Sequence, residues 1–176
     1  IRVGGKPFLE HLIDRLIAQG CSRFLLLLGY RHDVITDYFG DGSRWGVRIE
    51  YSVSPQEDET GLRLKRAQAK LDPIFMLLYC DNIWPLRLNR LLDHYQITGA
   101  DAQMVVYRND DGYRPRSNVE VDAKGFVCDY AKGRLSRNAS GVDAGFIIMK
   151  RKLVEDLVTS ENVSLEATLY PKLVAQ

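Results

Sequence analysis

Apolar positions in the first half of the chain alternate between strand-like runs and stripes at helical spacing. Continuous apolar runs occupy residues 24–28 and 74–79, and apolar and polar side chains alternate over residues 47–53. A continuous run indicates a strand buried on both faces, whereas alternation indicates a half-buried strand. Stripes at helical spacing between the runs predict helices over residues 8–17 and 34–39 and from about Thr60 to Leu71.

The second half of the chain departs from this strand–helix alternation. Two short segments, residues 118–122 and 126–130, flank the turn Ala123-Lys124-Gly125, which favours a β-hairpin over another crossover unit. The whole pattern predicts an α/β fold, a mixed sheet with helices on both faces. The other elements expected here are a helix over residues 88–95, strands over 102–107 and 142–149, a helix from about Lys152, and a helix capped by Ser164.

Composition narrows the class of protein. The 176 residues fit one domain, and 45% hydrophobic with 27% charged residues is ordinary for a soluble globular protein with a core. The 24 basic and 23 acidic residues leave a net charge of +1, so no broad positive field for nucleic acid or an anionic membrane is expected. No apolar run reaches membrane-spanning length. Three cysteines without metal-type spacing, and no secretory leader, favour reduced thiols in a cytoplasmic protein.

A carboxylate stands at the end of the second apolar run. The run closes with Asp81 and Asn82 before the loop 83–86. Open α/β folds keep their chemistry at the carboxyl ends of buried strands, so Asp81 is a candidate functional residue. Asp and Asn are also common turn formers, and spacing alone leaves the two readings of Asp81 equally open.

Basic residues near two helix starts offer local anion contacts. Lys6 precedes a helix N-terminus, where backbone amides and the helix dipole favour an anion such as phosphate. The more common role for such a lysine is a solvated turn residue. Thr60 is a suitable N-cap for the helix that follows it. That helix carries four basic residues, which either form a solvated face or include one that reaches a triphosphate.

Several familiar catalytic arrangements are missing from the sequence. It contains no Ser/His/Asp nucleophile turn, no paired-carboxylate signal and no Gly-x-Gly-x-x-Gly opening the first helix, which argues against a dinucleotide oxidoreductase. His94 has no metal-spaced partner, so a packed or surface histidine is the expected role.

Seven segments carry weak motifs, in this order: Lys6–Leu9, Gly29–Arg31 with Tyr38–Gly42, Thr60–Gly61, Tyr79–Asn82, Ala131–Lys132, Val142–Phe146, and Ser164–Glu166 with Tyr170–Leu173. In this order they resemble the motifs of sugar-phosphate nucleotidyltransferases over almost the whole chain. The resemblance implies a Rossmann-like, three-layer α/β/α mixed sheet of the nucleotide-diphospho-sugar transferase type, in a single domain over residues 1–176.

The resemblance also implies a reaction. A nucleoside triphosphate would condense with a hexose or heptose 1-phosphate to give a nucleotide-sugar and pyrophosphate. Such a site must hold two anions together and stabilise charge without a covalent nucleophile, and Mg²⁺, bound by one or two carboxylates and by phosphate oxygens, suits this task. A homo-oligomer, and a fused phosphatase domain downstream as in one subgroup, stay open.

Site residues follow from the motifs by resemblance. Asp81 would bind Mg²⁺, and Lys6 would contact phosphate. Three of the motif residues also have an explanation without substrate: a surface lysine at position 132, a glycine needed for packing at position 145, and an acid favoured in the first helical turn at position 166. For the substrates, the candidates are Thr60 and Gly61 at the base or ribose, Lys132 at the sugar phosphate, Asp143 and Gly145 at the sugar ring, and Asn118 and Glu166 as further sugar contacts.

The sequence also departs from the family pattern. The glycine-rich phosphate loop and the first strand of the sheet are expected before Ile1, and a second metal-binding aspartate is expected beyond Gln176. Glu59 replaces a glycine, Ala131 a glutamate and Asp143 an asparagine. An acid at position 59 would repel phosphate if it faced the nucleotide. Two other functions therefore remain open: a catalytically weak regulatory homologue, and a metal-dependent glycosyltransferase, although its usual pair of acids one residue apart is missing.

Overall fold

The structure is a computed structural model that describes residues 1–110, 117–131 and 139–175. The described chain divides into two compact units. Unit 1 comprises Ile1–Glu57 and Leu78–Ala100, and unit 2 comprises Asp58–Leu77 and Asp101–Gln176. Each unit has a core of its own, and no described helix is long and apolar enough to cross a membrane.

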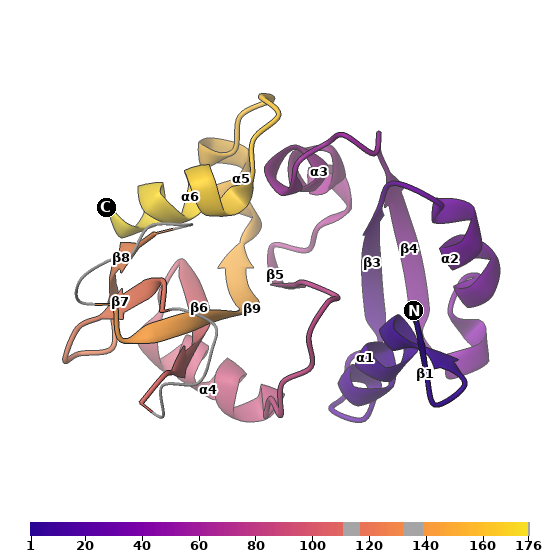
Figure 1. Ribbon diagram of the computed structural model, residues 1–176, viewed down its shortest axis with the longest axis horizontal. Helices are drawn as coiled ribbons and strands as arrows, with labels where there is room; N and C mark the ends of the chain where they lie inside the picture. The colour runs from indigo at the N-terminus through magenta and orange to yellow at the C-terminus, as the bar shows by residue number, and fades with distance from the viewer. Residues whose placement is uncertain (111–116, 132–138, 176) are drawn as a thin grey trace. The chain divides into compact units, whose positions relative to one another are not determined.

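Unit 1 is built on two parallel strands. β3 (Arg23–Leu28) pairs with β4 (Arg48–Val53) from Arg23 opposite Arg48 to Leu28 opposite Val53, and α2 (His32–Phe39) connects them. Figure 1 shows α2 alongside β4. The predicted strand–helix–strand unit is therefore confirmed. The other elements are β1 (Arg2–Val3), β2 (Lys6–Pro7), α1 (Phe8–Ile17), the 3₁₀-helix η1 (Ser43–Trp45) and α4 (Leu88–Thr98).

The core of unit 1 joins its helices to its sheet. Ile13 of α1, Phe39 of α2 and Ile49 of β4 are each at most 4% exposed and form one cluster. Phe39 packs edge-on against Tyr38, with ring centroids 5.0 Å apart, and lies 5.3 Å from the Trp45 ring. The short antiparallel pair of β1 and β2, which the sequence pattern did not predict, leads into α1.

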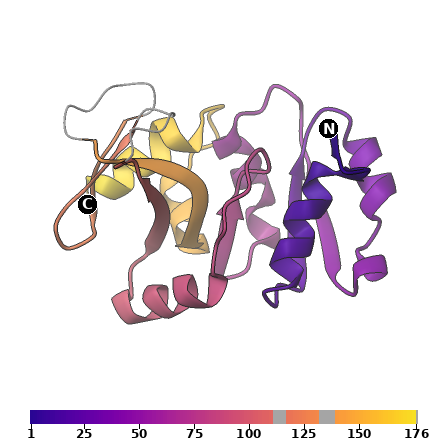
Figure 2. The same ribbon diagram turned by 60° about the horizontal axis from the view of Figure 1, so that its bottom comes forward.

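Unit 2 contains a five-stranded sheet, in which the pairs β6–β9, β7–β8 and β7–β9 are antiparallel. Its strand order is β5-β9-β7-β8, with β6 also paired to β9. Figure 2 shows the strong bend of β9 within this sheet. The elements are α3 (Thr60–Ala67), the 3₁₀-helix η2 (Gln68–Lys70), β5 (Ile74–Leu78), β6 (Ala102–Arg108), β7 (Val119–Val121), β8 (Val127–Tyr130), β9 (Gly141–Lys150), α5 (Arg151–Leu157) and α6 (Leu165–Val174).

The bend of β9 coincides with a bulge. Met104 of β6 pairs with Ile147, but Val106 pairs with Asp143, so one residue of β6 lies opposite residues 144–146 of β9. Extra residues in one strand bend it and redirect its side chains. Gly145, in the middle of the bulge, has φ of 76°, a backbone conformation that glycine adopts without steric cost. The bulge thus sets the direction of Asp143.

Helices of unit 2 bury an apolar core against the sheet. α6 packs on β8 and on α3 (Figure 1), and α5 packs on β9. The fully buried side chains include Leu64, Ile148, Met149, Val154, Leu165 and Leu169.

The α/β class and the order of the elements are as the sequence predicts, but neither strand with a continuous apolar run is fully buried, and residues 24–27 of β3 are half-buried. β5 was expected to be buried on both faces, yet its last four residues are only half-buried and Ile74 is 51% exposed. The reason is its place in the sheet, because β5 ends the strand order and has one neighbour, β9, among the described strands. The prediction of a single domain over residues 1–176 stays a prediction.

Candidate functional site

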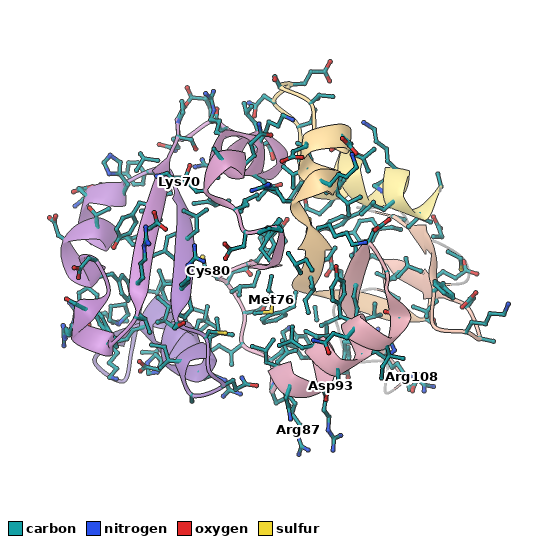
Figure 3. The ribbon with its side chains drawn as sticks, turned by 180° about the vertical axis from the view of Figure 1, so that it is seen from behind. Lys70, Met76, Cys80, Arg87, Asp93 and Arg108 are labelled. Atoms are coloured by element: carbon teal, nitrogen blue, oxygen red, sulfur yellow. The ribbon has the colours of Figure 1, made fainter. Side chains whose placement is uncertain are left out.

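Asp81 lies in the turn after β5, in the part of the chain that belongs to unit 1. Its side chain is exposed, and Cys80, labelled in Figure 3, directly precedes it. The Asn82 side-chain amide donates a hydrogen bond to Asp81 Oδ1 at 3.4 Å. Asn82 Oδ1 is shielded from solvent and has no hydrogen-bond partner within the described residues, which costs about 1–3 kcal/mol for a buried acceptor. The turn therefore exposes the carboxylate of Asp81, while the neighbouring amide oxygen is enclosed and unsatisfied.

This oxygen-rich turn fits a hard divalent cation. Mg²⁺ takes oxygen ligands and keeps several waters, so one carboxylate suffices when phosphate oxygens complete the shell. No group of three or more His, Cys, Asp or Glu residues gathers as a metal centre in the described part of the chain. A cation at Asp81 would accordingly depend on its phosphate ligand for most of its coordination. The unsatisfied oxygen of Asn82 was not foreseen, because sequence gives no measure of hydrogen-bond satisfaction.

Lys6 lies on β2 in unit 1 and contacts two acids of α1. Its ammonium group is 3.3 Å from Glu10 Oε1 and 3.1 Å from Asp14 Oδ2. These contacts raise the pKa of Lys6, the hydrogen bond with Asp14 most of all. Glu10 is only 3% exposed and accepts a 2.6 Å hydrogen bond from the Tyr38 hydroxyl, which holds the pKa of Glu10 below its usual range. Lys6 thus has a structural role here, and its phosphate contact stays a prediction.

Thr60 opens α3 in unit 2, but it does not cap that helix. The N-cap is Glu59, which has an extended backbone and no side-chain capping bond. The prediction of Thr60 as the cap is therefore wrong, because the helix begins at Thr60 itself. Its hydroxyl instead accepts from the backbone N–H of Leu165 at 3.0 Å and donates to Glu166 Oε2 at 3.4 Å. Thr60 thereby ties α3 to the start of α6.

Glu59 occupies the position at which the resemblance expects glycine. Its backbone N–H donates to Asn162 Oδ1 at 2.6 Å, and the residue is exposed on unit 2. The carboxylate is therefore free to remain in solvent, where its charge is screened.

Gly61 is buried by the protein itself. Its N–H donates to the Val163 carbonyl oxygen at 3.0 Å, and a Cβ built on Gly61 would lie 2.4 Å from that same oxygen. The sequence argument attributed this glycine to close approach of a nucleotide. In the structure the close approach is made by the backbone of residue 163, while the predicted nucleotide contact stays untested.

Asp143 lies at the bulge of β9 and is held by three neighbours. Its Oδ2 accepts from the Tyr130 hydroxyl at 3.0 Å, and its Oδ1 accepts from the backbone N–H of Gly145 at 2.8 Å. The backbone N–H of Asp143 donates to Asn118 Oδ1 at 2.9 Å. Two strands and the bulge therefore fix both the backbone and the carboxylate of Asp143.

The electrostatics of this group follow from its burial. Burial raises the pKa of Asp143, the nearby charge of Glu166 adds to the rise, and the hydrogen bonds from Gly145 and Tyr130 oppose it. Burial also raises the pKa of Tyr130 far above its ordinary value, with the Asp143 charge as the next cause. Tyr130 therefore keeps its proton and acts as a hydrogen-bond donor to Asp143.

Unit 2 thus brings together most of the residues that the sequence singled out. Hydrogen bonds and the electrostatic influence of Glu166 connect them in one group, which we call the Asp143 cluster: Thr60, Asn118, Tyr130, Asp143, Gly145 and Glu166. Asp81 and Lys6 belong to unit 1, and Lys132 lies outside the described residues. Tyr130 was missed by sequence reasoning. The only signal was its place at the end of the predicted hairpin, directly before Ala131-Lys132.

The chemistry of the Asp143 cluster is that of a hydrogen-bond acceptor. Asp143 supplies carboxylate oxygens with more lone pairs than the two protein donors described here occupy, and Glu166 adds a second carboxylate nearby. Groups of this kind bind ligands that carry several hydroxyl donors.

Comparison with known proteins shows the family of the chain. Residues 1–116 match the family described as Nucleotidyl transferase, which is more than half of the chain. The chain belongs to this nucleotidyl transferase family. Its class of fold, an α/β sheet with helices, is the one that the sequence predicted.

Two relatives of the chain are named as guanylyltransferases that act on sugar 1-phosphates. The chain is 28% identical over 172 residues to mannose-1-phosphate guanylyltransferase from Mycobacterium tuberculosis, covering 97% of this chain and 48% of the relative. It is 27% identical over 179 residues to D-glycero-alpha-D-manno-heptose 1-phosphate guanylyltransferase from Campylobacter jejuni, covering 99% and 77%. The chain therefore spans about half the length of the first relative and about three quarters of the second.

A solved structure shows the same fold. HddC from Yersinia pseudotuberculosis, crystallised with GMP-PN, superposes with a TM-score of 0.76 at 22% identity, over 94% of this chain and 72% of that one. At 22% identity this superposition shows a shared fold and carries no further conclusion.

Proposed function

We propose that the protein is a sugar-1-phosphate nucleotidyltransferase, which condenses a nucleoside triphosphate with a hexose or heptose 1-phosphate. The observation that carries the proposal is the Asp143 cluster, a half-buried group whose carboxylates are suited to sugar hydroxyls, in a chain of the nucleotidyl transferase family. In the reaction a phosphate oxygen of the sugar attacks the α-phosphorus. The bond from the α-phosphorus to the bridging oxygen breaks, and pyrophosphate leaves with that oxygen.

The proposed role of each residue follows from its chemistry. Mg²⁺ supplies charge neutralisation for the triphosphate when it is bound, and Asp81 is the residue that would hold it. Asp143, Asn118 and Glu166 orient the sugar, which converts the encounter of two anions into a reaction between positioned groups. The metal-site assignment is supported by the exposed carboxylate of Asp81 beside the unsatisfied oxygen of Asn82.

For the substrates, the relatives suggest an order of testing. Two of the most similar relatives are named as guanylyltransferases, one for mannose 1-phosphate and one for a heptose 1-phosphate, and a third from Haloferax volcanii as a uridylyltransferase. We therefore infer GTP as the first nucleotide to test and UTP as the second. A fused phosphatase domain, a homo-oligomer and a cytoplasmic location remain proposals.

The experiment is pyrophosphate release by the natural full-length protein with Mg²⁺. Each of the four ribonucleoside triphosphates is paired with mannose, glucose and heptose 1-phosphates. Release that needs one triphosphate and one sugar phosphate would support the proposal. No release from folded protein with any pair would refute it and would leave a regulatory homologue as the better explanation.

A variant tests the part played by Asp81. Asp81→Asn should leave folding unchanged, because the side chain is exposed, and should lower kcat by at least about 100-fold, the order seen when one electrostatic stabiliser of a transition state is lost. Asp93→Asn is the matched control, since Asp93 is also an exposed acid of unit 1 and is labelled in Figure 3 on α4. Equal activity of the two variants would rule out Asp81 as the metal ligand.

A further inference from the structure

Tyr130 is a buried residue whose hydroxyl faces the carboxylate of Asp143. Tyr130 is 6% exposed, and its ring packs edge-on against Tyr170 of α6, with centroids 5.1 Å apart. Across the hairpin it pairs with Val119, which is fully buried. The ring is therefore fixed from two sides, by the sheet and by α6. Packing alone accounts for the aromatic ring at this position, but it gives no reason for a hydroxyl.

The Tyr130 hydroxyl is the second of two hydrogen-bond donors to the Asp143 carboxylate. Asp143 Oδ1 is held by the N–H of Gly145 within its own bulge, and Oδ2 is held by Tyr130 from β8. A carboxylate has about four acceptor positions, so two remain for a ligand. Without Tyr130, the N–H of Gly145 would be the one hydrogen-bond donor to this carboxylate within the described residues, and the side chain would be less firmly oriented.

These two hydrogen bonds also determine which ligand groups Asp143 binds. An aspartate held in this way offers acceptors only, whereas an asparagine would offer one acceptor and one N–H donor. The charge of Glu166 acts on both Asp143 and Tyr130, so a second acid lies near the pair. A ligand hydroxyl suits such a place, and a ligand carboxylate is repelled by it.

Resting on the proposed function, we propose that Tyr130 is a positioning residue. It orients Asp143 to accept a hydrogen bond from a sugar hydroxyl, and the pair selects neutral sugar 1-phosphates over uronic acid 1-phosphates. Tyr130 acts through Asp143 and does not itself touch the reacting phosphates. The role therefore concerns recognition of the sugar and leaves the nucleotide unaffected.

The test begins with Tyr130→Phe, which keeps the ring and removes only the hydroxyl. The KM for the sugar 1-phosphate should rise roughly 10–150-fold, the range expected when a hydrogen bond to a charged group is lost, and the KM for the triphosphate should change less than about 2-fold. Tyr51→Phe is the matched control, because its hydroxyl donates to the backbone oxygen of Gly40 in unit 1. An unchanged sugar KM, or equal changes in both KM values, would overturn the role of Tyr130.

A double-mutant cycle separates positioning from general loss of structure. In an Asp143→Asn background, Tyr130→Phe should add less than about 2-fold to the sugar KM, because the carboxylate it orients is gone. Full additivity of the two substitutions would show that Tyr130 acts independently of Asp143 and would overturn the proposal. The cycle is run on variants whose near-UV circular dichroism matches that of the wild type.

Selectivity is measured first on the wild type and then on Asp143→Asn. The ratio of kcat/KM for a hexose 1-phosphate to that for the matching hexuronic acid 1-phosphate should exceed about 100 and should fall at least about 10-fold in Asp143→Asn. Equal use of both sugars by the wild type would overturn the selection. Complete inactivity of the wild type would instead refute the proposed function, which distinguishes the two failures.

Discussion

Replacing Gly61 with alanine tests whether the backbone of residue 163, by itself, requires a glycine at this position. The new methyl carbon would lie 2.4 Å from the Val163 carbonyl oxygen, well inside van der Waals contact. That oxygen accepts the hydrogen bond from the Gly61 N–H, so it is unable to move away without loss of the bond. The substitution therefore forces the start of α3 away from residues 163–165.

The change in the free energy of unfolding has two destabilising contributions and one stabilising contribution. Overpacking a tight site destabilises by about 1–3 kcal/mol, and loss of one backbone hydrogen bond adds about 0.5–1.5 kcal/mol. Alanine is a better helix former than glycine, which returns about 0.5–1 kcal/mol. The free energy of unfolding should thus fall by about 0.5–4 kcal/mol, and the contacts of Thr60 with Leu165 and Glu166 should weaken with it.

Urea unfolding of wild type and Gly61→Ala, followed by circular dichroism, measures the change through the transition midpoint. The sign of the change decides the question. If Gly61 were required only for a nucleotide, alanine would leave the free protein unchanged or stabilise it through its helix propensity. Stabilisation of the unliganded variant would therefore refute the packing argument. A loss of stability without ligand would support it.

Two further predictions concern buried groups elsewhere in the chain. The Tyr38 hydrogen bond lowers the pKa of Glu10 below 4.5, so the stability that ionised Glu10 adds is present above pH 4.5 and is lost as the pH falls through the lower, folded-state pKa. The difference in unfolding free energy between wild type and Glu10→Gln should shrink over that window in urea titrations, and a constant difference would contradict this. Leu169→Ala, at a fully buried position of α6, should destabilise by about 2–5 kcal/mol in the same assay, against less than about 1 kcal/mol for Leu92→Ala at a 40% exposed position.

The local elements could be predicted from the sequence because their signals are local. Apolar periodicity placed the helices and strands within a few residues of their observed bounds, and the turn at residues 123–125 correctly indicated the hairpin of β7 and β8. Ser164 was expected to cap its helix, and its hydroxyl accepts from the Ala167 N–H at 3.3 Å. The place of Asp81 after a strand is likewise a property of chain order. Motif order also indicated the nucleotidyl transferase family, which the comparisons confirm.

Contacts between segments far apart in the sequence could not be predicted from such local patterns. Thr60 and Glu166 are 106 residues apart, and no local pattern indicates that their side chains meet. The sequence suggested that Thr60 caps its own helix, whereas the structure uses its hydroxyl at the start of α6. In the same way the reason for Gly61 became clear only when the neighbouring backbone of Val163 was in place.

The sequence by itself determined which residues were available for chemistry, and only the tertiary structure decided which of them act together. Asp143, Gly145 and Asn118 could be named from motifs, but the pairing of Asp143 with Tyr130 depends on a bulge in β9. Strand register fixes the direction of every side chain in a sheet, and added residues in one strand change that direction. Because register and bulges result from packing across the whole sheet, the partner of a site residue is a property of the folded chain.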